Sequence, residues 1–320
     1  MARASGRDYS FERLAPGVHA ARAIAGGAGL CNSAIVDLGG TTVVFDTGTS
    51  PAGGRTLYRA AIRLTGRPPA FVVNSHYHAD HHWGNAAFPG AHLVATRRTR
   101  ALVLARSART FREWRKVLPQ EIEALRHPTP PIESRDVPEL RGWFRAVLRI
   151  PSPLRVVPPD LTFSGAIRLE GTRRAVDVIS YGGGHTDSDA FAFLPDERIV
   201  CAGDLALSGY HLSMGDGWPV PWIEILRRIE RLRPTAVVPG HGAVGGGELL
   251  RQSAEYAATI VALARRARRA GRAVGELRRT EVPERYRALR FSLMFPENLV
   301  RAYRLSGRRA PRPPEFGSFK

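Results

Sequence analysis

The stretch that most constrains this chain runs from Asn74 to His82, reads NSHYHADHH, and directly follows the apolar run PAFVV. Four of the ten histidines fall within these residues, with one aspartate among them. The apolar run predicts a short buried strand, so the histidines lie on a tight loop at a sheet edge. Imidazoles and carboxylates gathered on such a loop are typical of a metal site.

Three further positions repeat this context. His185 follows a run of three glycines, Asp204 follows Gly203, and His241 stands between two glycines. In each case an apolar strand is predicted to end, glycine lets the backbone turn sharply, and one ligand-capable side chain follows. Five histidines and two aspartates suit two metal ions rather than one. The complete candidate set is His76, His78, Asp80, His81, His185, Asp204 and His241.

The pattern H-x-H-x-D-H, followed by a separate His, Asp and His, resembles the metallo-β-lactamase superfamily of binuclear hydrolases. The resemblance covers roughly residues 11 to 245, less an inserted region. It implies an α/β fold, a four-layer αββα sandwich of two mixed β-sheets flanked by helices, with the metals at one edge between the sheets. It also implies how the ligands divide. One metal would be held by His76, His78 and His185, a second by Asp80, His81 and His241, with Asp204 bridging both.

The chemistry of this ligand set indicates the cofactors. Neutral imidazole suits zinc, and carboxylates offset the charge of the metals, so we predict two Zn²⁺ ions, with iron or manganese also possible in their place. Coordination lowers the pKa of water from 15.7 to about 7, which supplies hydroxide at neutral pH. Asp80 is the predicted catalytic residue, because it can ligate a metal and also orient that hydroxide.

The predicted activity is hydrolysis of a small ester, lactone, thioester or β-lactam amide. Many founding lactamases have cysteine where this chain has Asp204, so the site is more similar to the lactonase, thioesterase and glyoxalase-type branches. A second hypothesis is a phosphodiesterase acting on RNA or nucleotides, since relatives of the tRNA 3′-processing endonuclease share the ligand set. A third is a mononuclear iron persulfide dioxygenase, and a fourth is a non-enzymatic metal-binding scaffold.

The formal net charge of +18 raises nucleic acid as a partner. However, lysine occurs only at Lys116 and Lys320 and the arginines are spread through the chain, so a small-molecule substrate is favoured over nucleic acid. No stretch approaches the roughly 18 consecutive apolar residues of a membrane span. The N-terminus lacks the apolar run of a secretory signal, and Cys31 and Cys201 make no disulfide framework, so we predict a cytoplasmic protein.

Composition divides the chain into regions. Residues 1–245 are predicted to form the catalytic domain, with a helical, Pro- and Arg-rich insertion at about 96–159. Residues 246–305 are a predicted C-terminal helical extension, and 306–320 a disordered tail. At least one insertion aromatic is predicted to face the substrate. These aromatics are Phe111, Trp114, Trp143 and Phe144.

Apolar runs and turn residues predict the remaining elements. VHAARAI, SAIVDL and TTVVFDT predict a meander of strands, with Gly39-Gly40 as a hairpin turn. LTFSGAIRLE predicts another strand. A helix is expected to begin near Asp80, which can cap it, and to end before Pro89-Gly90. Further helices are predicted over 54–65, 222–232 and 247–270.

Several residues near the motif have more ordinary interpretations. The motif is complete without His82, which is predicted to point away from the metals. His211 either lines a pocket or has a structural role. Cys201 is predicted to be a small buried hydrophobe. The residues that follow His185, from Thr186 to Asp189, either hold that histidine through hydrogen bonds or form a turn or helix cap.

Overall fold

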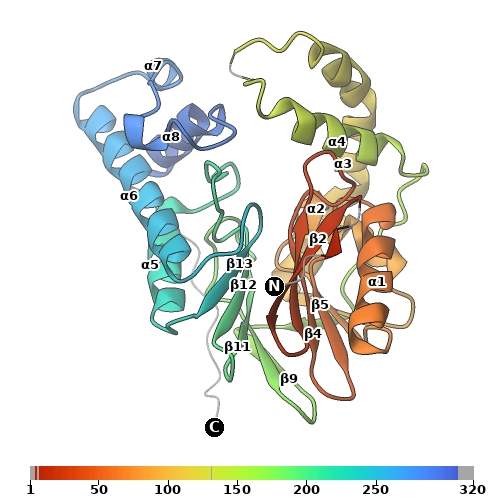
Figure 1. The fold of residues 1–320 in the computed structure, drawn as a ribbon. Helices are drawn as coiled ribbons and strands as arrows, with labels where there is room; N and C mark the ends of the chain where they lie inside the picture. Colours follow the sequence, from red (N-terminus) through yellow and green to blue (C-terminus); the bar gives the residue numbers. More distant parts are fainter. Residues whose placement is uncertain (1–3, 6, 131, 309–320) are drawn as a thin grey trace.

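The computed structural model describes residues 4–308 except 6 and 131. Two β-sheets lie face to face, and helices cover the outer face of each sheet (Figure 1). This is the αββα sandwich predicted from the sequence. In the described part of the chain, no helix is both long enough and apolar enough to cross a membrane.

Among the described residues, the first sheet has eight strands in sequence order. Its first five strands pair antiparallel and its last four pair parallel. The predicted hairpin turn is confirmed, since Gly39 and Gly40 adopt φ values of 84° and 79°. The strands are β1 (Ala4–Ser5), β2 (Tyr9–Ala15), β3 (Val18–Ala23), β4 (Ser33–Asp37), β5 (Thr42–Phe45), β6 (Phe71–Val73), β7 (His92–Thr96) and β8 (Leu161–Phe163).

The second sheet has five strands in the order β13-β12-β11-β10-β9 within the same described ranges. The prediction of one strand over LTFSGAIRLE is wrong, because β8 ends in the first sheet and β9 begins in the second. Gly165 lies between them with φ of 78°, a conformation that lets the chain change sheets. The strands are β9 (Ala166–Glu170), β10 (Ala175–Ile179), β11 (Phe191–Leu194), β12 (Ile199–Gly203) and β13 (Ala236–Pro239).

Three apolar layers hold the sandwich together. Val73, Val178 and Cys201 belong to the layer between the sheets, where Cys201 is buried as predicted. Outside the first sheet, α1 (Pro51–Thr65) packs its Leu57 into a second layer. Each such side chain contributes about 1.5–3 kcal/mol when fully buried. The third layer lies between the second sheet and the helices α5 (Pro219–Glu230), α6 (Glu248–Arg269) and α8 (Met294–Leu305).

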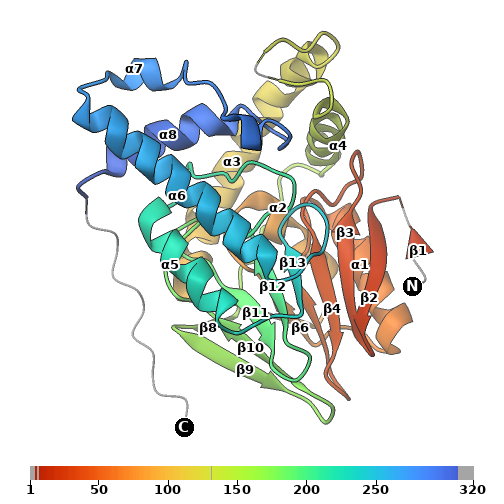
Figure 2. The ribbon, with the colours of Figure 1, turned by 60° about the vertical axis from the view of Figure 1, so that its left-hand side comes forward.

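Two helices of the insertion lie at the end of the sandwich that carries the histidine loop (Figures 1 and 2). They are α3 (Arg97–Ala124) and α4 (Val137–Leu148), so the predicted insertion is helical. Their aromatic core includes Phe111 and Phe144 and reaches Trp83, next to the histidine loop. The remaining short elements are α7 (Val274–Leu277) and η2 (Glu284–Tyr286).

The division into a catalytic domain and a C-terminal extension remains a prediction. Helix α6 shares its apolar layer with α5 and with the second sheet. Of the predicted disordered tail, residues 309–320 lie outside the described residues.

Candidate metal centre

The histidine loop begins where β6 ends and continues as α2 (Ala79–His82) and η1 (Trp83–Ala87). The prediction that Asp80 caps this helix is wrong. His78 occupies the N-cap position, without a side-chain cap bond. The Asp80 carboxylate instead lies 3.3 Å from Nε2 of His241, which comes from the loop after β13.

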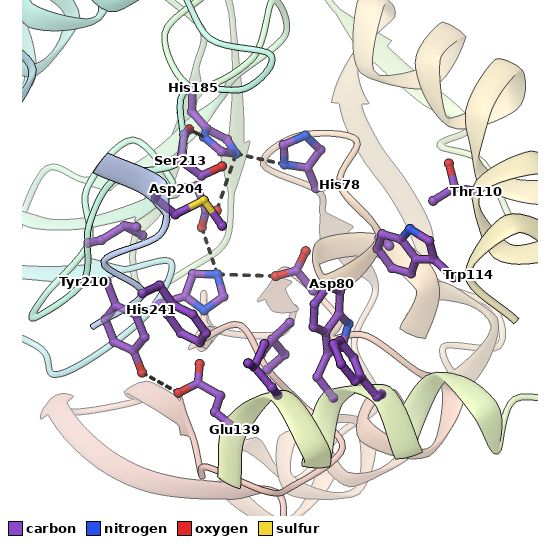
Figure 3. A pocket seen from close by; sticks show the side chains of 18 of the residues that line it. His78, Asp80, Thr110, Trp114, Glu139, His185, Asp204, Tyr210, Ser213 and His241 are labelled. Atoms are coloured by element: carbon purple, nitrogen blue, oxygen red, sulfur yellow. Dashed lines mark hydrogen bonds and ion pairs between the residues drawn. The ribbon is translucent and has the colours of Figure 1, made fainter. Parts of the chain in front are cut away.

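The fold brings all seven predicted residues together at one edge of the two sheets. Figure 3 labels five of them, His78, Asp80, His185, Asp204 and His241. They form two groups, and within each group one ligand atom per residue lies within 4.8 Å of the others. Group one is His76, His78, His185 and Asp204, and group two is Asp80, His81 and His241.

Group one is built around three imidazoles. Nδ1 of His78 lies 2.9 Å from Nε2 of His185, which is 3.5 Å from Oδ2 of Asp204. Burial, reinforced by neighbouring imidazoles, lowers the pKa of His76 well below its usual range. Burial also lowers the pKa of His185 to about 4. Both rings are therefore neutral near pH 7, the form that binds metals.

In group two, each imidazole lies close to two carboxylates, those of Asp80 and of the neighbouring Asp204. Nε2 of His81 lies 3.4 Å from Oδ2 of Asp80 and 3.2 Å from Oδ1 of Asp204. Nε2 of His241 is 3.3 Å from Asp80 and 3.4 Å from Asp204. Asp204 therefore turns Oδ2 toward group one and Oδ1 toward group two. A glycine allows this close approach, because a Cβ at Gly240 would lie only 1.9 Å from Asp204 Oδ1.

The donor atoms fit a divalent metal in two respects. Zn–N bonds of 2.0–2.1 Å in a tetrahedral site place neighbouring ligand atoms about 3.3 Å apart. The contacts of group two, at 3.2–3.4 Å, match that spacing. In addition, three atoms of the candidate ligand set are buried without a hydrogen-bond partner among the described residues, and each such atom costs about 1–3 kcal/mol. They are Nε2 of His76, Nε2 of His81 and Oδ1 of Asp204.

The far side of the His81 ring is held by Asp46, at the end of β5. Its Oδ2 lies 2.7 Å from Nδ1 of His81 and accepts a 2.7 Å hydrogen bond from Ser75 Oγ. Burial raises the pKa of Asp46, although its contact with His81 opposes that shift. The Asp46 contact leaves Nε2 of His81 facing group two. The sequence did not reveal this role.

Asp216, on the loop between β12 and α5, holds His78 in a similar way. Its Oδ2 lies 3.2 Å from Nε2 of His78 and accepts a 2.5 Å bond from the Tyr77 hydroxyl. The His78 contact lowers the pKa of Asp216. His185 is oriented by a backbone group, since its Nδ1 lies 2.8 Å from the carbonyl oxygen of Ser213. Asp216 and Ser213 were not among the predicted site residues.

The residues after His185 hold its loop rather than its ring. Asp189 accepts hydrogen bonds from the backbone N–H groups of Gly184 and Thr186 and from the Thr186 hydroxyl. Burial raises the pKa of Asp189 to about 7. The loop conformation is therefore fixed on both sides of the ligand.

Two histidines outside the ligand groups have protein partners. Nε2 of His82 lies 3.2 Å from the Ser107 hydroxyl, and burial lowers its pKa to about 3. Nδ1 of His211 lies 2.9 Å from the Tyr256 hydroxyl. His82 and His211 both line the pocket next to the metal centre. His82 belongs to neither ligand group, in agreement with the prediction that it points away from the metals.

A cavity of about 530 Å³ opens over the metal centre. Asp80, His78, His185, Asp204 and His241 line one part of it (Figure 3). Its remaining walls come mainly from the insertion, from the loop between β12 and α5, and from the residues just before and at the start of α8. Three of the four insertion aromatics line it, namely Trp114, Trp143 and Phe144, whereas Phe111 is buried among the helices.

Comparisons with known proteins agree with this geometry. The family model described as Metallo-beta-lactamase superfamily matches residues 26–241. A metallo-beta-lactamase type 2 from Bacteroides fragilis is 33% identical over 97 residues, which is 29% of this chain and 39% of that protein. The chain thus aligns with well under half of the length of this curated relative.

Solved structures resemble the whole sandwich. A metallo-beta-lactamase from Pontibacter korlensis superposes with a TM-score of 0.58 at 18% identity, over 78% of this chain and 98% of that one. The DIM-1 metallo-beta-lactamase superposes with a TM-score of 0.56 at 20% identity, over 79% of this chain and 98% of that one. At these identities the likeness shows the fold.

Proposed function

The chain belongs to the metallo-β-lactamase superfamily, and from that premise we propose that it is a binuclear zinc hydrolase of a small ester, lactone, thioester or β-lactam. One observation carries the proposal. Two groups of ligand atoms share Asp204, which turns one oxygen toward each group, at the floor of a pocket large enough for a small molecule.

In this proposal His76, His78 and His185 hold one metal, Asp80, His81 and His241 hold the other, and Asp204 joins both. When bound, the metals lower the pKa of water and polarise the substrate carbonyl. The contacts of Asp46, Asp216 and Ser213 support this arrangement, because each fixes one ligand ring from the side away from the donor atom.

Asp80 is the proposed catalytic residue. Burial alone would raise its pKa, but the neighbouring His81 and His241 lower it well below the usual range, so the carboxylate is ionised. It also lines the pocket, where it can orient the attacking water toward the substrate. Its backbone is held as well, since the Cys31 thiol donates a 2.8 Å hydrogen bond to the Asp80 carbonyl oxygen.

A turnover screen on the zinc-loaded protein tests this function. The panel is p-nitrophenyl acetate, a γ-lactone, an acyl thioester, a chromogenic cephalosporin and bis-p-nitrophenyl phosphate. We expect turnover of at least one carboxyl derivative, abolished by a chelator, restored by zinc and lost in Asp80→Ala. Cleavage of the phosphodiester alone would replace the proposal with the phosphodiesterase hypothesis, and no turnover at all would reject it.

A further inference from the structure

The pocket above the metal centre is lined largely by apolar side chains that are only half-buried. Apolar surface gathered in a concave site is typical of a pocket that binds an apolar group. These side chains come from α3, from the loop between α3 and α4, from α4, and from the residues just before or at the start of α8. They include Trp114, Ile132, Leu140, Trp143, Leu293 and Met294.

The aromatic part of this wall is braced by its own contacts. The ring of Trp114 lies 5.3 Å from that of Trp83 and 5.1 Å from that of Trp143, and Trp143 lies 5.1 Å from Phe144. Edge-to-face and tilted arrangements at such distances are favourable for aromatic rings. The aromatic wall is therefore held in place by protein contacts, and Trp114 packs against both Trp83 and Trp143.

The positively charged side chain that lines the pocket already contacts other protein groups. Among the described residues that line it, the one arginine is Arg106, whose Nη1 donates a 2.7 Å bond to the Tyr77 hydroxyl. The same nitrogen lies 3.5 Å from Oδ1 of Asp216. Arg106 is thus the single arginine in the described lining, which holds no lysine, and its charge is partly balanced by Asp216, so little positive charge faces a substrate carboxylate or phosphate away from the metals.

The acidic side chains of the wall point to the same conclusion. Glu139 is ion-paired with Arg290. Glu121 is exposed and makes no ion pair within the described chain, so it would repel an anionic group. The wall therefore favours an uncharged group over an anionic one.

We propose that the substrate is an uncharged ester, lactone or thioester whose acyl group is long or bulky and apolar, and that Trp114 determines this selectivity. The inference rests on the proposed hydrolase function. Figure 3 shows Trp114 on the same side of the pocket as Asp80, facing the metal centre. In the reaction, hydroxide from water bonds to the acyl carbon, its bond to the leaving oxygen or sulfur breaks, and the proton goes to the leaving atom.

Chain-length selectivity is the first test. On the zinc-loaded full chain, kcat/KM for p-nitrophenyl octanoate should exceed that for the acetate at least tenfold, since each buried methylene adds favourable transfer free energy. Trp114→Ala should reduce that ratio at least fivefold, because the octanoate loses more of its kcat/KM than the acetate does. Trp114→Phe should recover most of the ratio. Leu104→Ala, at an exposed position of the same helix, is the matched control and should leave it unchanged.

Charge selectivity is the second test. Mono-p-nitrophenyl suberate matches the octanoate in length but ends in a carboxylate, and its kcat/KM should be at least tenfold lower. Equal rates for the two esters, or a flat chain-length profile, would overturn the inference while leaving the hydrolase function intact.

A binding measurement separates failure of the inference from failure of the function. We expect 2-decanone, which cannot be hydrolysed, to quench tryptophan fluorescence at concentrations at least tenfold lower than 2-butanone. The Trp114→Ala variant should lose this difference. Tight 2-decanone binding without hydrolysis of any ester would reject the hydrolase and keep the apolar site. Equal binding of the two ketones would reject the apolar site.

Discussion

The floor and the wall of the pocket are built on different principles. The floor is the metal centre of seven candidate ligands, five of which line the pocket, and His78, His81 and His185 each have their second ring nitrogen held by another group. The wall consists of the apolar side chains of the insertion and of the segment before α8. The floor is polar and fixed by hydrogen bonds, whereas the wall is apolar and fixed by packing. Under the proposed function, the residues for reaction chemistry and those for substrate choice therefore belong to separate parts of the chain.

One arginine joins the parts of the wall. Arg290 donates from Nε to Oδ1 of Asp136 at 3.0 Å and also contacts Glu139, so it ties the C-terminal segment to α4. Its Nη1 donates a 2.9 Å bond to the Tyr210 hydroxyl, beside His241. Arg290 therefore connects the wall of the pocket to the loop that carries Tyr210, next to the metal centre.

The largest loss of activity is expected when Asp204, which both ligand groups share, is replaced. Asp204→Ala should lower kcat at least 1,000-fold, because it removes the proposed bridge between the metals. Asp160→Asn is the control, since that carboxylate is exposed and pairs with His92 far from the site. Steady-state kinetics gives kcat for both variants, and circular dichroism shows whether each is folded. A properly folded Asp204→Ala variant with activity near that of the wild type would mean that the floor is not the reaction centre.

Asp46 is expected to have the next largest effect, although it lies outside the pocket. Asp46→Ala frees the His81 ring and should weaken zinc binding about 10–100-fold, the usual range for such supporting carboxylates. Asp46→Asn keeps one acceptor and should recover part of the affinity. Competition with a chromogenic chelator measures this. Unchanged affinity in both variants would show that His81 does not need its partner.

A smaller effect is expected from Asp216, because its side chain is 43% exposed and water can replace it. Asp216→Asn should weaken zinc binding about tenfold or less, at the low end of the range for supporting carboxylates. The same chelator competition, run beside Asp46→Ala, ranks the two supports. A larger loss for Asp216 than for Asp46 would reverse the proposed order.

The smallest effect on kcat is expected from the wall. Arg290→Gln leaves the buried Asp136 without its ion pair and should lower the free energy of unfolding by about 2 kcal/mol, less than for a fully buried pair because Arg290 is partly exposed. KM for an apolar ester should rise several-fold while kcat changes little. Urea unfolding and Michaelis–Menten kinetics measure these values. A loss of kcat as large as that for Asp204→Ala would contradict the separation of floor and wall.

The floor was predictable because its residue types and spacing coincide with strand ends. His76, His78 and His241 each follow an apolar run, so a local pattern was sufficient to group them. Asp46 was not predictable as a support for His81, because an Asp-Thr-Gly after a strand is also an ordinary turn signal. The contact spans 35 residues and exists only once β5 and β6 pair.

The errors have physical causes. Asp80 has the residue type of a helix cap, but its carboxylate is occupied by His241 from the second sheet. The run LTFSGAIRLE has continuous strand propensity, and only the packing of two sheets shows that Gly165 divides it. Similarly, the sequence indicated that an insertion aromatic would face the substrate, but it did not single out Trp114, whose position depends on how α3 and α4 pack.

The zinc content of the purified protein tests the central claim most directly. After zinc loading and gel filtration, mass spectrometry of the metal should give two zinc ions per chain for the wild type. A wild-type value of one or less would contradict a centre in which Asp204 joins two metals.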